Sequence, residues 1–303
     1  MGVVSVIDVL LPLLLAPLLL GVINRTKAVV AGRRGQPLLQ AYFDLAKLLC
    51  KGAVYSSTTT WIFRAGPVVG LAAMLVAAAL VPFGGVPACL VFPGDLILFA
   101  YLLGLVRFVT VLAALDTGSS FEGMGASREV SFSALAEPAL LLALAALALH
   151  TGDLSLSAMY GRIDATSWAV AAPALTLVAG ALVLVFLTEN ARIPVDDPTT
   201  HLELTMIHEV MVLDHGGPDL AFILYGSALK LWLLGALLVG LVVPVRSGML
   251  WLDVGAALAG MFGLAILTGL IESSMARWRL VRIPQLLVGA GLMSVLGLVL
   301  MLR

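Results

Sequence analysis

The stretch ATSWAVAAPALTLVAGALVLVFLT, residues 165–188, contains no charged side chain and decides the class of fold. A helix that crosses a bilayer needs about 20 mostly apolar residues, because hydrocarbon cannot satisfy unpaired backbone groups. Residues 65–94, 254–271 and 283–302 are also free of charge. The sequence therefore predicts an all-α polytopic membrane protein.

The composition of the whole chain agrees with this interpretation. Its 303 residues are 61% hydrophobic and 12% charged, with a net charge of -1, and the mean hydropathy is +1.10. An average soluble domain carries about 25% charged residues. The composition excludes a soluble globular enzyme, a disordered protein and a nucleic-acid binder. The two cysteines, Cys50 and Cys89, are too few for a disulfide framework or an iron–sulfur cluster.

Three further apolar stretches carry one charge each: Asp8 in 3–24, Arg107 in 96–115 and Lys230 in 220–245. We therefore predict about eight transmembrane helices in a single integral membrane domain, residues 1–303. The predicted ranges are 3–24, 66–82, 95–115, 134–150, 167–188, 219–244, 251–271 and 283–302.

Basic side chains are distributed unevenly over the predicted loops. Three lie on one side, Arg162, Arg246 and Arg303. Because loops rich in Lys and Arg stay in the cytoplasm, we expect both termini outside the cytoplasmic (inner) membrane, and the loops 116–133, 189–218 and 272–282 inside. The twelve basic residues on the inner side are Arg25, Lys27, Arg33, Arg34, Lys47, Lys51, Arg64, Arg128, Arg192, Arg277, Arg279 and Arg282.

Residues 36–54 carry an amphipathic pattern. Apolar side chains such as Tyr42 and Phe43 recur at helical spacing opposite Asp44 and Lys47. The pattern predicts a helix that lies in the cytoplasmic interface, where it could float on lipid, cover a cavity or dock a partner.

Arg107 and Lys230 lie near the middle of their predicted helices. A lipid-facing helix has no reason to keep a charge, so both are candidates for a polar pathway. The alternative is a structural ion pair, because snorkelling does not extend so far from a helix end.

Acidic side chains concentrate in and beside two of the cytoplasmic loops. There they alternate with apolar residues, which indicates packing rather than a freely solvated loop, and partly buried carboxylates can exchange protons near neutral pH. Glu137 precedes Pro138, so we expect it at a helix start, where the helix dipole favours a carboxylate. The candidates for a proton pathway are Glu122, Glu129, Glu137, Glu189, Asp196, Asp197, Glu203 and Glu209.

Three histidines, His201, His208 and His215, are spaced seven residues apart, so a helix would place them on one face. They do not form the H-E-x-x-H arrangement of a zinc site, and we expect structural or proton-relay roles instead. The glycine-rich run 118–125 lacks the Gly-Lys-Ser/Thr of a phosphate-binding loop. We therefore expect no catalytic, metal or redox centre on this chain.

Several motifs resemble a known family. They are LDTGSSF (115–121) with GASRE (125–129), ESSMARWRL (272–280), and Arg33-Arg34-Gly35 followed by Leu39-Gln40, Asp44 and Lys47-Leu48-Leu49. These resemble the membrane subunit of formate hydrogenlyase and of related membrane-bound nickel–iron hydrogenases, in which Lys230 and Glu137 also have counterparts. That family is similar to the quinone-pocket subunit of respiratory complex I (subunit 1, or H). The loop motif of that subunit is matched by Glu189, Arg192, Pro194, Asp196 and Glu203, whereas Thr199 and His201 depart from it.

The resemblance implies a non-catalytic membrane anchor and proton-coupling subunit of an oxidoreductase complex. It would link hydrogenase-like large and small subunits, which hold the nickel–iron centre and iron–sulfur clusters, to antiporter-like membrane subunits. We expect docking or structural roles for Arg33, Arg34, Asp44, Lys47, Arg128, Arg192, Arg277 and Arg279.

Two alternatives stay open. The first is a quinone-binding subunit of a complex I-like NADH or other dehydrogenase, with a pocket between the first helix, residues 36–54 and loop 189–218. The second is a stand-alone ion transporter or channel, although no inverted repeat points to it.

Overall fold

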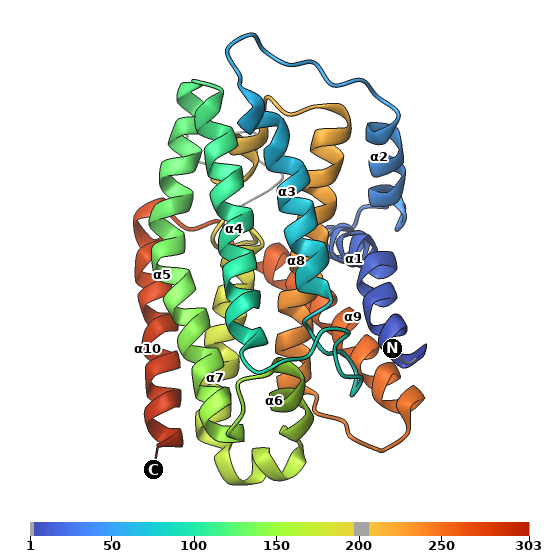
Figure 1. The fold of residues 1–303 in the computed structure, drawn as a ribbon, viewed down its shortest axis with the longest axis vertical. Coiled ribbons are helices and arrows are strands. Elements are labelled where there is room, and N and C mark those ends of the chain that lie inside the picture. The colour runs from blue at the N-terminus through green and yellow to red at the C-terminus, as the bar shows by residue number, and fades with distance from the viewer. Residues whose placement is uncertain (1–2, 197–205, 303) are drawn as a thin grey trace.

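The computed structural model describes residues 3–196 and 206–302, and the predicted site residues Asp197, Glu203 and His201 lie outside them. Over the described residues the chain forms ten α-helices and two short 3-10 helices (Figure 1). Eight of the α-helices are long and apolar enough to cross a membrane. They are α1 (Val3–Val30), α3 (Trp61–Ala78), α4 (Asp95–Asp116), α5 (Ser120–Thr151), α7 (Ala165–Glu189), α8 (Gly217–Val242), α9 (Leu250–Ser274) and α10 (Ile283–Met301).

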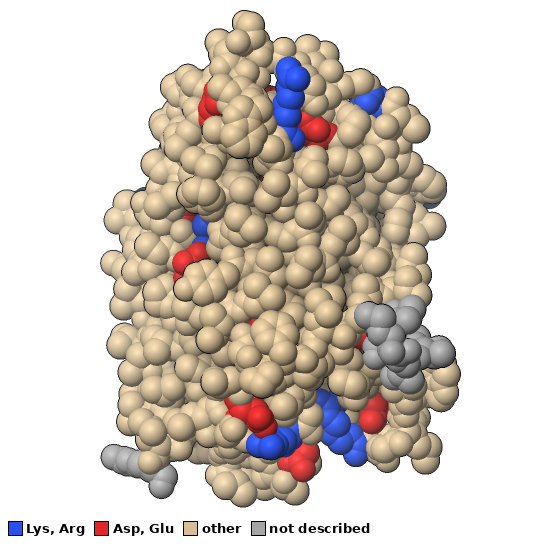
Figure 2. Space-filling view, viewed as in Figure 1, with Lys and Arg blue, Asp and Glu red and all other residues tan. Residues whose placement is uncertain are grey.

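The predicted membrane fold is confirmed, and α8 forms its centre. This helix packs against α1, α3, α7 and α9. Of the residues in its most apolar 18-residue stretch, 67% are buried. Leu229, Leu233 and Trp232 are all almost fully buried, which is expected of a helix that is apolar on every side. The outer helices instead expose large apolar side chains such as Leu14, Tyr101 and Val170. In Figure 2 most of the visible Lys, Arg, Asp and Glu side chains lie near the two ends of the molecule, and one group of basic and acidic side chains shows about halfway along its left side.

The prediction of a loop over 116–133 is wrong for most of its length. Helix α5 begins at Ser120, so Glu137 lies inside the helix with Pro138 and not at its start. Serine and glycine have weak helix propensity, which hid the helix in the sequence. Packing supplies the stability: α5 contacts the 3-10 helix η1 (Glu209–Val212), and a Cβ on Gly125 would lie 2.3 Å from Val210 Cγ1. As a result α5 rises above the upper end of α10 in Figure 1.

The amphipathic helix is confirmed as α2 (Gln40–Leu49), shorter than the predicted range 36–54. Helix α2 lies against α1 and α8, and the Tyr42 hydroxyl donates to the Leu14 carbonyl of α1. None of its residues is buried. Phe43 and Leu49 are exposed, so α2 presents apolar side chains on the outside of the molecule.

A short helix that the sequence did not predict, α6 (Leu156–Arg162), follows α5. Its start is held by Asp95, which is fully buried at the beginning of α4. The Ser155 hydroxyl donates to Asp95 Oδ2 over 2.7 Å, and the Leu156 amide donates to Asp95 Oδ1 over 2.6 Å. Because the residue that caps α6 comes from a distant part of the chain, residues 155–162 carry no sequence pattern that predicts this helix.

Loop 272–282 contains the end of α9 and a second 3-10 helix, η2 (Leu280–Arg282). Cys50 and Cys89 are both free thiols.

Candidate functional site

Arg107, on α4, stands at the centre of a group of buried charges. Its Nε donates to Glu129 Oε1 over 3.0 Å, and its two terminal nitrogens contact Glu137 and Glu189. Glu129 and Glu189 are 6% and 5% exposed, and the Glu137 side chain is 48% exposed. Side chains from α4, α5 and α7 therefore meet, because α4 lies beside α5 and α5 lies beside α7.

Two further side chains extend this group. Lys230 Nζ, on α8, lies 3.5 Å from Glu189 Oε2, and His208 Nε2 lies 3.2 Å from Glu129 Oε2. We call Arg107, Glu129, Glu137, Glu189, Lys230 and His208 the relay cluster. Its buried ions are paired, as the high desolvation cost of an isolated charge requires.

Arg107 and Lys230 do not act as separate charges on two helices. Both cations contact the same carboxylate, Glu189, which ends α7. The sequence identified all three residues as candidates but could not show that one carboxylate serves both cations.

A small cavity adjoins the relay cluster. It is lined by Glu129, Glu189, His208, Ser133 and Thr188, among others, and has a volume of about 10 Å³. This is close to the roughly 10–15 Å³ that one water needs. One water at this place would have carboxylate, imidazole and hydroxyl partners.

Residues 189–196 continue from the relay cluster into a second set of ion pairs, which we call the loop network. Arg192 Nη1 lies 3.3 Å from Glu272 Oε1, and Lys27 Nζ lies 2.8 Å from Glu272 Oε2. Asp196 Oδ1 accepts from Arg277 over 3.0 Å. The loop is thereby connected to α1, to α9 and to the segment that follows α9.

The second half of the same loop is held by backbone contacts. The Ile207 amide donates to Asp196 Oδ2 over 3.0 Å, and Arg128 donates to the Met206 carbonyl over 2.8 Å. Both Ile207 and Met206 are buried. The apolar residues that the structure describes in this half of the loop are therefore packed, and Leu202 and Leu204 lie outside the described residues.

Glu122 and Glu209 lie apart from the relay cluster. Glu122 is buried near the start of α5, where its Oε1 accepts the Asp214 amide over 3.1 Å. Glu209 begins η1 and is half-buried.

The histidines do not share a helix face within the described residues. His208 precedes the four-residue η1 and reaches Glu129, whereas His215 stacks on Phe63 with ring centroids 3.9 Å apart. Burial lowers the pKa of His215, and Asp219 and Asp214 oppose that shift. In the described part of the chain no group of three or more His, Cys, Asp or Glu side chains could hold a metal.

The remaining predicted docking residues lie on the surface. Arg33, Arg34, Asp44, Lys47 and Arg279 are all exposed, and none of them takes part in the ion pairs of the relay cluster or the loop network. Their predicted roles remain predictions.

Some buried charges were absent from the sequence-based candidates. Glu272 and Lys27 complete the loop network, and Glu272 already stood out as part of the motif at 272–280. Asp8, 1% exposed, was visible as the single acid of the first apolar stretch.

The cavity beside the relay cluster is not lined by α1 or α2, and neither is a second cavity of about 180 Å³ at the C-terminal end of α8. The quinone pocket expected beside α1 and α2 stays a prediction.

Comparisons with known proteins identify the family of this chain. The model of the NADH dehydrogenase family matches residues 3–302. The chain is 31% identical to formate hydrogenlyase subunit 4 of Escherichia coli (strain K12) over 277 residues, which is 89% of each chain. It is 35% identical to hydrogenase-4 component C of the same organism over 234 residues, which is 77% of this chain and 72% of that one.

A solved structure supports the fold alone. A chain of the membrane-bound sulfane sulfur reductase, an archaeal respiratory membrane complex, superposes with a TM-score of 0.83 over 98% of both chains, at 19% identity. Fold, family model and relatives lead to one conclusion: this multi-pass membrane protein belongs to the NADH dehydrogenase family.

Proposed function

We propose that this chain is the non-catalytic membrane anchor and proton-coupling subunit of a multisubunit hydrogenase complex of the formate hydrogenlyase type. Its similarity to formate hydrogenlyase subunit 4 and hydrogenase-4 component C supports this assignment. In this role the nickel–iron centre and iron–sulfur clusters belong to hydrogenase-like partner subunits. This chain supplies the membrane seat and a path for protons between that redox arm and antiporter-like membrane subunits.

The observation that carries the proposal is the sharing of one guanidinium by three carboxylates in the relay cluster. A proton that reaches Glu129 removes one of the negative charges competing for Arg107, so the guanidinium is drawn towards Glu189 and Glu137. Each such change alters the attraction between Glu189 and Lys230. The cluster can therefore occupy two arrangements that differ by the position of one proton, which is the kind of two-state element that coupling requires.

The loop network offers a mechanical connection to a redox arm. Glu189 and Arg192 are separated by only two residues, and Arg192 and Asp196 are paired with Glu272 and Arg277. A partner that shifts this loop moves the carboxylate of Glu189 against Arg107 and Lys230.

The excess of Lys and Arg in these loops favours placing them on the cytoplasmic side of the inner membrane, with both termini outside.

Glu137→Gln tests the proposal, because the half-exposed Glu137 side chain can lose its charge with little effect on folding. We expect the complex to assemble and to evolve hydrogen when an ionophore removes the proton gradient. Proton translocation per turnover in sealed membrane vesicles should fall several-fold. Lys51→Gln, which removes a charge at an exposed position just after α2, serves as the control and should leave translocation unchanged.

Glu129→Gln extends the test to the buried part of the cluster. It should lower translocation further, because Glu129 also contacts His208. If translocation per turnover is unchanged in both Glu137→Gln and Glu129→Gln, the proposed coupling role of the relay cluster is wrong.

A further inference from the structure

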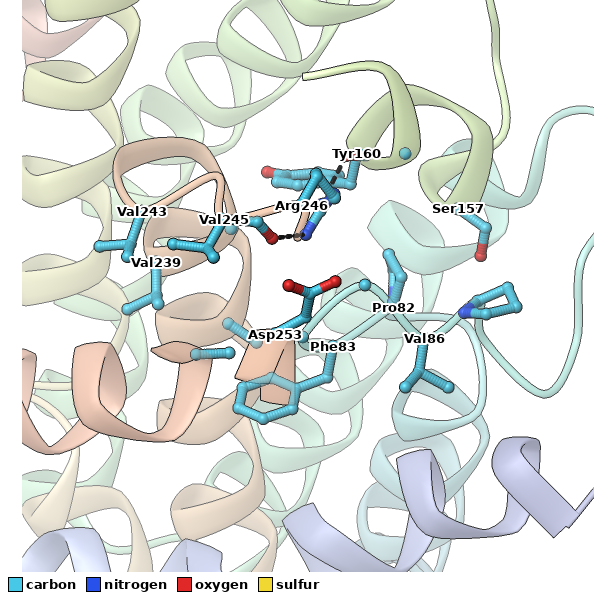
Figure 3. A pocket seen from close by; sticks show the side chains of 17 residues that line it. Pro82, Phe83, Val86, Ser157, Tyr160, Val239, Val243, Val245, Arg246 and Asp253 are labelled. Atoms are coloured by element: carbon cyan, nitrogen blue, oxygen red, sulfur yellow. Dashed lines mark hydrogen bonds between the residues drawn. The ribbon is translucent and has the colours of Figure 1, made fainter. Parts of the chain in front are cut away.

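A cavity of about 180 Å³ lies far from the relay cluster, where α8 ends and α9 begins. Its walls come from residues 82–87 after α3, from α6, and from the ends of α8 and α9 that face each other (Figure 3). Because α6 lies at the lower end of the view in Figure 1, the cavity belongs to that end of the molecule. One water needs only about 10–15 Å³, so this space is large enough for a polar group of several atoms.

The walls of the cavity are held in place by contacts outside it. The Ala88 amide donates to Ser157 Oγ over 2.9 Å, which fixes the loop after α3 to α6. Phe83 packs on Trp232 of α8 with ring centroids 5.3 Å apart. The space is therefore formed before any ligand enters.

Two opposite charges face each other across the cavity without forming an ion pair within 4.0 Å in the described structure (Figure 3). Arg246 donates to the carbonyls of Tyr160 and Val245 over 2.7 and 3.1 Å. Asp253 Oδ1 accepts from the amide and the hydroxyl of Ser247 over 2.8 and 2.7 Å. Each charge is thus anchored to its own wall, so the two are held apart.

Gly85 borders the space between the Arg246 and Asp253 side chains. A Cβ on Gly85 would lie 3.3 Å from Asp253 Oδ2 and 3.7 Å from Arg246 Nη1. Arg246 Nη1 therefore borders this space on the cationic side, and Asp253 Oδ2 borders it on the acidic side. A guanidinium N–H beside an open space can donate to a phosphate oxygen.

The cavity lies at the level of a membrane interface. Trp251 and Met249, at the start of α9, are 78% and 63% exposed. Tryptophan is enriched where a membrane protein meets the lipid headgroups. Val242 and Val245, beside the cavity, are also exposed, so an apolar chain could run outward from it.

We propose that this cavity binds the headgroup of a phospholipid that carries a phosphate beside a primary ammonium group, as phosphatidylethanolamine does. The phosphate accepts from the Arg246 guanidinium at Nη1, and the ammonium donates to Asp253 Oδ2. A purely anionic headgroup would leave Asp253 without a cation. A quaternary choline has no N–H to donate to Asp253, so phosphatidylethanolamine is preferred over both.

The test uses the purified native complex, stripped of loosely held lipid and offered equal amounts of phosphatidylethanolamine, phosphatidylcholine and phosphatidylglycerol. Lipids retained per complex are counted by native mass spectrometry in the wild type and in Asp253→Asn. An asparagine oxygen still accepts from Ser247, so this variant removes the charge and keeps the local fold. We expect one fewer phosphatidylethanolamine in Asp253→Asn, with a loss of preference of roughly tenfold at this site.

Arg162→Gln is the matched control, because Arg162 lies on the neighbouring α6 but pairs with Asp153 outside the cavity lining. It should retain the wild-type lipid count. Arg246→Lys keeps the positive charge but removes the guanidinium with its planar set of donors, and should also lose the bound lipid. This variant tests the phosphate contact when Asp253 is intact.

Three results would overturn the proposal. The first is equal retention of all three lipids by the wild type, and the second is an unchanged lipid count in both Asp253→Asn and Arg246→Lys. The third is retention of free phosphoethanolamine as strongly as the lipid, which would show a soluble ligand instead. None of these results bears on proton coupling by the relay cluster, so the two proposals are tested separately.

Discussion

The relay cluster and the cavity use the same kinds of charged side chain in opposite ways. In the relay cluster, Arg107 contacts three carboxylates directly and the adjoining space holds about one water. In the cavity, Arg246 and Asp253 face each other but are held apart by contacts to their own walls, around about 180 Å³ of space. Direct pairing leaves room only for a proton to move, whereas separated charges leave room for a ligand.

Replacing Arg107 should therefore lower the stability of the protein more than replacing Arg246. The loss of stability on replacing Arg107 is the largest effect we expect. Arg107→Met leaves Glu129 buried without its arginine and Glu189 with Lys230 as its one remaining cation in the relay cluster, a loss of about 3–5 kcal/mol of stability. Arg246→Met removes two hydrogen bonds to backbone carbonyls at a wall open to solvent, a loss of about 1–3 kcal/mol. Thermal unfolding and yield of the purified complex measure both. Equal losses in the two variants would contradict the contrast between a closed and an open charge site.

Packing at the start of α5 provides the second test. Gly125→Ala would place a Cβ 2.3 Å from Val210 Cγ1 and 3.0 Å from Met211 Cγ, and overpacking of this kind costs about 1–3 kcal/mol. Gly123→Ala, in the same helix, meets nothing within 4 Å, and should stabilise α5 by up to about 1 kcal/mol. Thermal unfolding of the two variants should shift in opposite directions. Shifts of the same sign would show that η1 does not press against α5.

The smallest expected effect is a pH dependence at His215. Burial against Phe63 lowers the pKa of His215 below its ordinary value, so the folded protein favours the neutral ring. The unfolded chain then binds more protons, and the stability contribution of His215 is lost as pH falls through about 6.5. His215→Gln should reduce the fall in melting temperature between about pH 7.5 and pH 5.5 relative to the wild type. An identical fall in the two proteins would mean that His215 does not titrate differently on folding.

Local features of the sequence were enough to identify the membrane helices. Runs such as 165–188 cannot be stable in any other way than as buried or lipid-facing helices, because they contain no charge over a membrane-spanning length. The same reasoning located α2, because apolar side chains that recur at helical spacing predict a helix whatever that helix contacts. It failed at residues 120–133, where Ser and Gly weaken the helical signal and contact with η1 restores the helix.

The candidate site was predicted as a set of residues but not as an arrangement. Arg107, Lys230 and the acidic residues stand out in the sequence because an isolated charge is costly in a membrane. The sequence does not show that Glu189 contacts both cations or that Arg192 pairs with Glu272. These contacts join side chains that are far apart in the chain. Length and composition are enough to identify the segments that enter the membrane and the charges that must be compensated there. The partner of each charge follows from the folded arrangement, because ion pairing depends on distances of a few ångströms between different helices.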